Sequence, residues 1–140
     1  MQSKEKNDII FIRFNPNEDL NAILKQVCNK YKIKTAIIIS GIGQLKNVKL
    51  GYFKGKNDYS PKEFDKPMEI LSLTGNICKE DDEYLFHLHT VLGDENKNAI
   101  GGHFIEGTIG VTAEIILLKT NIDIKRQIDK ETGLKTLFLE

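Results

Sequence analysis

Three histidines are the residues of this sequence whose type and spacing could support metal chemistry. They are the only histidines in the chain, and they lie close together at His87, His89 and His103. Successive side chains of a strand point to opposite faces, so His87 and His89 would project from the same face. If the polar segment 93–98 closes a hairpin centred near Asn96, His103 faces His89 across the ladder. All three imidazoles would then converge.

Converging imidazoles favour a divalent metal. Neutral imidazole nitrogens bind Zn²⁺, Cu²⁺, Ni²⁺ or Fe²⁺, and three protein ligands leave one position open for water or a substrate. The pattern therefore predicts a metal site at His87, His89 and His103, with zinc as the expected ion. Histidines spaced in this way also occur on half-exposed strands without a ligand, hydrogen-bonded to their neighbours, so that structural interpretation stays open.

Length and composition indicate one ordinary globular domain. At 140 residues, of which 40% are hydrophobic and 29% charged, the chain is expected to form a single unit over residues 1–140. Its 20 basic residues balance 20 acidic ones, and only two of the cations are arginines, Arg13 and Arg126. Strong non-specific DNA binding needs an excess of cationic side chains to displace counterions from phosphates, so this balance argues against it.

The cysteines and the lengths of the apolar runs indicate the cellular compartment in which the protein is expected. Cys28 and Cys78 are far apart in the sequence and form no C-x-x-C pair, so we interpret them as buried thiols of a reduced cytoplasmic protein. A disulfide between them stays open. No apolar run has the length of a signal peptide or of a membrane span. We therefore expect a soluble, cytoplasmic protein with no membrane partner.

The elements that must position the histidines are mostly strands. Asn17 is the expected N-cap of an amphipathic helix that continues to Tyr31, with Glu18 and Asp19 in its first turn. Gly107 and Gly110 are expected to bound a turn. Apolar or alternating runs predict strands at 9–14, 35–40, 48–53, 68–78, 84–92, 111–118 and, as a short closing strand, 134–139. Strands that follow one another without helices predict an α+β fold, an antiparallel-dominated sheet covered by one or two helices.

Two further features invite a functional interpretation. Gly41-Ile42-Gly43 resembles the start of a phosphate-binding loop, but Lys46 stands where the third glycine would be and no helical pattern follows. A bulge or tight corner is favoured there. Glu114 is an isolated acid within an aliphatic run, so it is expected either on the exposed face or paired with a cation.

Taken together, the motifs resemble the plants-and-prokaryotes-conserved domain family, known as the PPC or PCC domain. The resemblance covers nearly the whole chain, and it implies a compact α+β subunit assembled as a homotrimer. It also implies a metal role for His87, His89 and His103, and a place near the site for Glu69. The matching elements are the opening strand with Arg13, the segments 36–43 and 69–75, His87-Leu88-His89, Gly101-Gly102-His103 and Glu106-Gly107.

The same resemblance raises the question of DNA. In plants this domain is attached to AT-hook segments whose Arg-Gly-Arg cores enter the minor groove, and stand-alone prokaryotic members carry a DNA-binding label by analogy. This chain has no Arg-Gly-Arg, and Lys66-Pro67-Met68 replaces the Gly-Arg-Phe of the plant forms. The role of that arginine cannot be carried over.

The leading interpretation is therefore a trimeric, metal-binding PPC-domain protein with a binding or regulatory role. The family label describes such proteins as DNA-binding. The alternative is a metal-dependent enzyme acting on a small molecule. A three-histidine site with an open position lowers the pKa of bound water, and a carboxylate such as Glu69 or Glu114 could move the proton. Arg13 is a further candidate for ligand binding. A third interpretation is a protein-interaction scaffold in which the histidines have only a structural role. For the enzyme interpretation, the sequence indicates no particular substrate.

Weak DNA binding is a prediction that the composition supplies. At about 150 mM salt the isolated chain should not shift a fluorescent DNA duplex, because few phosphates would be neutralised. Trimerisation could bring three copies of a lysine cluster together and raise the avidity. Sub-micromolar affinity that disappears on changing these lysines to glutamate would restore the DNA-binding interpretation. The lysines concerned are Lys46, Lys49, Lys54 and Lys56.

Overall fold

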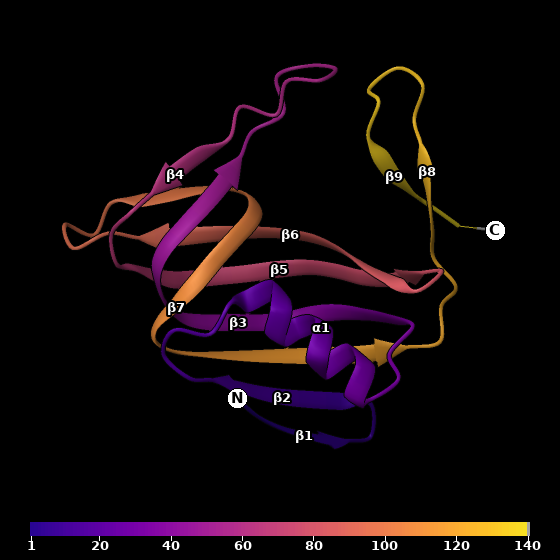
Figure 1. The fold of residues 1–140 in the computed structure, drawn as a ribbon, viewed down its shortest axis with the longest axis horizontal. Coiled ribbons are helices and arrows are strands. Elements are labelled where there is room, and N and C mark those ends of the chain that lie inside the picture. The colour runs from indigo at the N-terminus through magenta and orange to yellow at the C-terminus, as the bar shows by residue number, and fades with distance from the viewer. Residues whose placement is uncertain (140) are drawn as a thin grey trace.

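The computed structural model describes residues 1–139 as an antiparallel sheet with one helix. The main sheet has seven strands in the order β1-β2-β7-β6-β5-β3-β4, and β7 also pairs with β3 (Figure 1). This confirms the expected single domain with an antiparallel-dominated sheet. The elements are β1 (Gln2–Lys6), β2 (Ile9–Phe14), α1 (Leu20–Lys30), β3 (Thr35–Gly51), β4 (Lys62–Phe64), β5 (Met68–Glu80), β6 (Glu83–Gly93), β7 (Ala99–Thr120), β8 (Lys125–Ile128) and β9 (Lys135–Phe138).

Helix α1 lies on one face of the sheet, and its start corrects the sequence prediction. The N-cap is Asp19, whose carboxylate accepts a 2.7 Å hydrogen bond from the Ala22 amide, so the helix begins after Asn17 and Glu18. Asn17 has a φ of 68°, which places it in the turn that precedes the helix. The apolar face packs against the inward side chains of β2, β3 and β7 to form the core. Its buried members are Leu20, Ile23, Leu24, Val27 and Cys28.

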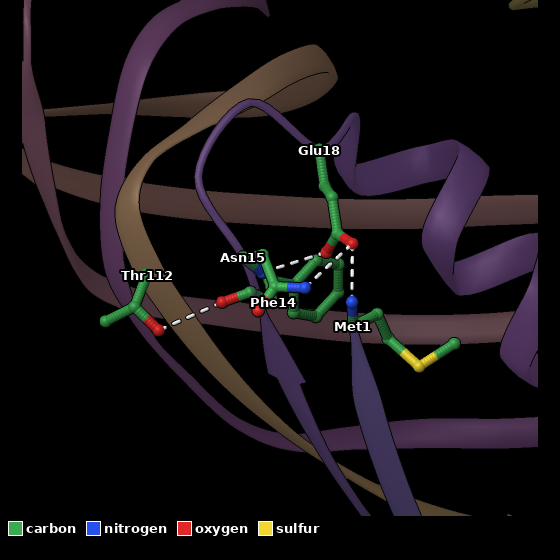
Figure 2. A network of polar contacts seen from close by, with 5 residues as sticks. All are labelled: Met1, Phe14, Asn15, Glu18 and Thr112. Carbon is green, nitrogen blue, oxygen red and sulfur yellow. Dashed lines mark hydrogen bonds and ion pairs between the residues drawn. The ribbon is translucent and has the colours of Figure 1, made fainter.

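Glu18 lies before the helix and not in its first turn, where the sequence placed it. Its carboxylate accepts hydrogen bonds from the Met1 amino group, at 2.5 Å, and from the Asn15 amide, at 2.8 Å (Figure 2). Burial opposes its ionisation, but these donors together lower the pKa of Glu18. One strand further along, the Thr112 hydroxyl donates to the Phe14 carbonyl at 3.0 Å. The network ties the first strand, which the sequence did not predict, to the turn that leads into α1.

The longest strand, β7, contains the position where a turn was expected. Gly107 and Gly110 lie inside β7, and the strand bends there instead of ending (Figure 1). A Cβ on Gly110 would lie 2.6 Å from the Gln44 side chain, so glycine permits the close approach of β3. On β3, Gly43 has a φ of 138° beside a register shift, which makes Gly41-Ile42-Gly43 part of a bulged strand. The predicted strands 35–40 and 48–53 are therefore one strand.

The face of the sheet opposite α1 carries exposed apolar side chains. Residues paired directly across neighbouring strands point to the same side, and one such row runs Ile9, Leu118, Ile37, Asn76, His87. His87 therefore lies on the same face as the exposed apolar residues. The exposed large apolar side chains on β2, β3, β5 and β6 are Ile9, Phe11, Ile37, Ile39, Ile42, Leu71 and Val91.

The C-terminal strand does not close the main sheet. β9 pairs only with β8, which was not predicted, and the two form a separate hairpin beside the open edge of the sheet (Figure 1). Polar contacts hold it there. Arg126 donates a short hydrogen bond to Asn76 Oδ1, and Lys135 Nζ lies 2.9 Å from Glu80 Oε2. The tip of the hairpin meets the segment between β3 and β4, where Lys56 Nζ lies 3.5 Å from the Lys130 carbonyl.

The cysteines are buried free thiols, as expected. Cys28 and Cys78 are both buried and unpaired, and burial raises the pKa of Cys28 to about 12. A thiol that remains protonated at neutral pH is a poor nucleophile, so Cys28 serves packing. Within residues 1–139, no helix is long and apolar enough to cross a membrane.

The Glu18 network generates a stability prediction. Glu18→Gln should lower the free energy of unfolding at pH 7 by about 1 kcal/mol, since a neutral amide accepts weaker hydrogen bonds than a carboxylate. The pKa of Glu18 is lowered by folding, so its contribution is present above the unfolded pKa and is lost as the pH falls through the folded pKa. Urea unfolding at pH 7 and at pH 3 measures the difference. Glu95→Gln, at an exposed turn position, is the control, and an equal loss in both variants would contradict the prediction.

Candidate metal centre

The three histidines converge as the sequence predicted. The turn after β6 places His89 directly opposite His103 on β7, and His87 lies two residues before His89 on the same face. The ring centroids are 5.3 to 5.5 Å apart in all three pairs. One nitrogen from each ring lies within 4.8 Å of the others. This is a single cluster in which each imidazole can direct a nitrogen toward a common point.

The environment of His87 and His103 favours their neutral forms. Burial, together with the neighbouring His89 and His87, lowers the pKa of His103 to about 4. Burial also lowers the pKa of His87, with further contributions from Arg126 and His89. A neutral imidazole offers a free lone pair, which is the form that binds a metal. His87 and His103 can therefore accept a cation at pH 7 without first losing a proton.

His103 supplies the observation that tests whether these residues fit a metal. Its Nδ1 atom is buried and, within residues 1–139, has no hydrogen-bond partner. A buried nitrogen without a partner is costly, since it has lost water and gained nothing. A cation bound to an imidazole lone pair removes that deficit, and three nitrogen ligands suit zinc and its neighbours in the first transition row. The residues present fit a divalent metal.

A cavity of about 380 Å³ opens beside the cluster. His87 and His103 form part of its wall, and Tyr59, whose ring centroid is 5.1 Å from that of His103, forms another part. The C-terminal hairpin supplies the opposite side through Arg126 and Leu137, among others. A molecule in this cavity would reach two of the three histidines.

Glu69 lies outside the histidine cluster. It precedes Thr74, the cross-strand partner of His89, by five positions on β5, which corresponds to on the order of 15 Å along a strand. Its carboxylate accepts a 2.9 Å hydrogen bond from Gln44. Within one subunit, the structure does not bring Glu69 to the histidines.

Arg13 and Glu114 also lie apart from the cluster within one subunit. They face each other across β2 and β7, eleven positions along β7 from His103. Both side chains are exposed. Glu114, for which the sequence allowed an exposed position or a cation partner, lies on the outer face opposite Arg13. Arg13 shares that face with Phe11, two residues before it on β2.

The sequence singled out the metal-ligand candidates but not the residues around them. Tyr59 and Arg126 come from separate segments and reach the histidine region only through tertiary packing, whereas Asn76 faces His87 through the pairing of β5 with β6. Arg126 had one sequence signal, because it is one of only two arginines in the chain. Its place could not be inferred without the β8–β9 hairpin.

This combination of fold and cluster defines a small antiparallel α+β domain with a surface cluster of three histidines. The sequence profile of the Plants and Prokaryotes Conserved (PCC) domain matches residues 1–121, and the chain belongs to this family. The sequence resemblance is thereby confirmed. A comparison with curated proteins gives no significant match.

Solved structures of similar fold extend the comparison. A "putative DNA binding protein" from Bacteroides thetaiotaomicron is 25% identical, with a TM-score of 0.91 over 99% of this chain and 96% of its own. A plant- and prokaryote-conserved protein from Pyrococcus horikoshii is 34% identical, with a TM-score of 0.82 over 96% and 91%. A metal-containing protein from Archaeoglobus fulgidus is 27% identical, with a TM-score of 0.84 over 96% and 95%. Of these three, one is named for a metal and one for DNA.

Proposed function

We propose that this protein binds one divalent metal ion per subunit, zinc by preference, through His87, His89 and His103. The convergence of three imidazoles, one with a buried nitrogen that has no hydrogen-bond partner within residues 1–139, carries the proposal. The metal-containing relative from Archaeoglobus fulgidus supports it. A metal held by three ligands acts as a Lewis acid on whatever occupies the remaining position. The leading role is binding or regulation through this site.

The DNA-binding role suggested by the name of the Bacteroides protein has less support in this chain. Of the lysines that could converge on DNA, Lys49 forms ion pairs with Glu63 at 3.0 Å and with Glu106 at 3.8 Å. Lys46 donates to the Asn17 side chain at 2.7 Å. An already paired ammonium gains little from a phosphate. Under this proposal, DNA binding would require several chains to present their lysines together, so that avidity compensates for the weak binding of one chain.

A metal-dependent enzyme is the second candidate, and the cavity beside the histidines favours it. A volume of about 380 Å³ falls within the range of small-molecule sites, roughly 300 to 1,000 Å³. A thermal-shift screen of small metabolites against the metal-loaded protein separates the candidates. A specific shift with a small molecule, lost in a metal-free sample, favours an enzyme. A shift only with DNA favours a regulator.

We further propose that the subunits assemble as a homotrimer through the exposed face of the sheet. This face carries large apolar side chains with nothing over them in one subunit, as with Phe11 at 59% exposed. Apolar surface of this kind usually marks an interface. Arg13 and Glu114 lie on the same face, so assembly would bury the pair among apolar neighbours and could bring it toward the site of an adjacent subunit. Residues 1–140 would then act as one PPC domain in each subunit.

The metal proposal predicts near-stoichiometric metal in freshly purified protein by elemental analysis. His89→Ala should release it, because two imidazoles rarely retain a divalent ion against dilution. His87→Ala and His103→Ala should do the same. Val91→Ala, two positions further along the same face of β6, retains all three imidazoles and is the matched control. Full metal content in all three histidine variants would exclude this assignment.

The assembly proposal predicts a trimeric mass by light scattering at micromolar concentration. Phe11→Asp should shift the mass toward the monomer, since a buried unpaired carboxylate is costly at an apolar interface. Circular dichroism should stay unchanged, because the side chain is exposed in the subunit. Ile128→Asp is the control, because Ile128 is an exposed apolar residue on the separate hairpin. A monomeric wild-type protein would exclude the trimer.

A further inference from the structure

The cavity beside the histidines has a cationic side that the metal proposal does not use. Arg126, on β8, faces this cavity from the C-terminal hairpin and is half-buried. Within residues 1–139 its guanidinium donates hydrogen bonds only to uncharged oxygens, the Asn76 side-chain carbonyl and, at 3.5 Å, the Lys135 backbone carbonyl. No carboxylate among these residues neutralises it.

The other cation at the cavity is already paired. Lys135 forms an ion pair with Glu80 at 2.9 Å, so its charge is compensated inside the protein. The histidines beside Arg126 supply no negative charge, and a divalent cation bound to them would add further positive charge. A half-buried guanidinium next to such a site has lost part of its hydration and lacks a counter-charge. This region of the cavity is therefore complementary to an anion.

The remaining walls indicate what kind of anion. The guanidinium fork matches carboxylate and phosphate oxygens equally well, so the arginine alone does not choose between them. Much of the rest of the lining is apolar and would be poorly matched to a compact inorganic ion. The apolar residues are Leu85, Phe86, Leu134 and Leu137. A ligand with a carbon body and one anionic end satisfies both parts of the wall.

We propose that this cavity binds a small organic acid, with its carboxylate on Arg126 and its apolar body against the leucines of the C-terminal hairpin. The proposal deepens the proposed metal-binding function, because the same ligand would present its other end toward His87 and His103. Tyr59 closes the side nearest His103. The β8–β9 hairpin is then the element that selects the ligand, whereas β6 and β7 supply the metal ligands.

Arg126 also holds the hairpin in place, so the test must separate charge recognition from folding. The probes are phenylacetate and its uncharged isostere phenylacetamide, with inorganic phosphate for comparison, titrated by NMR into metal-loaded and chelator-treated protein. A displaced hairpin would weaken the acid and the amide alike. Loss of the guanidinium charge alone would weaken only the acid.

Three variants complete the experiment. Arg126→Met removes the charge and retains an unbranched side chain, and Lys130→Met, at the exposed hairpin tip outside the cavity lining, is the control of equal charge change. Asn76→Asp gives Arg126 an internal carboxylate, which should hold the hairpin more firmly while competing with the ligand. The metal content of each variant is measured in parallel.

The wild-type protein should prefer phenylacetate over phenylacetamide by about tenfold or more, the usual gain from a charged hydrogen bond. Arg126→Met and Asn76→Asp should both reduce this ratio toward one, and Lys130→Met should preserve it. A wild-type protein that binds the acid no better than the amide, or a preference unchanged in Arg126→Met, would overturn the proposal. So would phosphate binding more tightly than phenylacetate.

Failure of the metal proposal has a different signature. If the chain holds no metal but the acid preference persists and depends on Arg126, the cavity assignment stands and the metal assignment falls. If metal is present in stoichiometric amount and the acid preference is absent, the reverse holds.

Discussion

The long pairing of β3 with β7 is the constraint on which the rest of the structure depends. β7 begins beside β6, where Ala99 to His103 pair with His89 to Gly93, and ends beside β2, where Ala113 to Leu118 pair with β2. β3 follows it over nearly its whole length. Because both strands bend together, one end of the ladder is fixed by the histidine hairpin and the other by the helix-covered core. A slip of one residue would move His103 to the opposite face.

The bend depends on close approaches that glycines allow. A Cβ on Gly43 would lie 2.4 Å from the Thr112 carbonyl oxygen of β7, and Gly43 has a φ that other residues rarely adopt. A Cβ on Gly107, which the sequence assigned to a turn, would lie 3.0 Å from the Phe104 ring and 3.2 Å from the Asn47 carbonyl oxygen. The strand can therefore curve without losing its partner, and residues on either side of the bend retain their inward or outward direction. The same glycines would have permitted a turn, which is why local pattern alone could not decide between the two.

The convergence of the histidines could be predicted from the sequence more completely than the strands and helix boundary around them. His89 and His103 face each other because turn length fixes hairpin register, and this is a local rule that a single sequence reveals. The predicted start of α1 was wrong because Asn17 and Asp19 are both acceptable N-caps, and local pattern alone does not choose between them. In the structure Asp19 is the cap, and Glu18 is held by Met1, a residue far away in the sequence. β1 and β8 were missed because their residues are mostly polar and exposed, so their strand conformation comes from pairing with a neighbour. Tertiary partners of this kind leave no periodic signal.

The two walls of the cavity beside the histidines differ in how firmly the fold holds them. The metal-ligand candidates lie on strands whose directions are fixed by the central ladder, within the residues that match the PCC family. Arg126 lies beyond residue 121, on a hairpin held to the body through a few polar contacts. Polar contacts at a surface contribute little stability and change readily between sequences. A rigid set of imidazoles combined with a weakly attached wall would let one fold retain the proposed metal site while the hairpin adapts to different ligands. Among residues 1–139, a guanidinium without a carboxylate partner and an apolar surface determine what that wall would accept under the proposal.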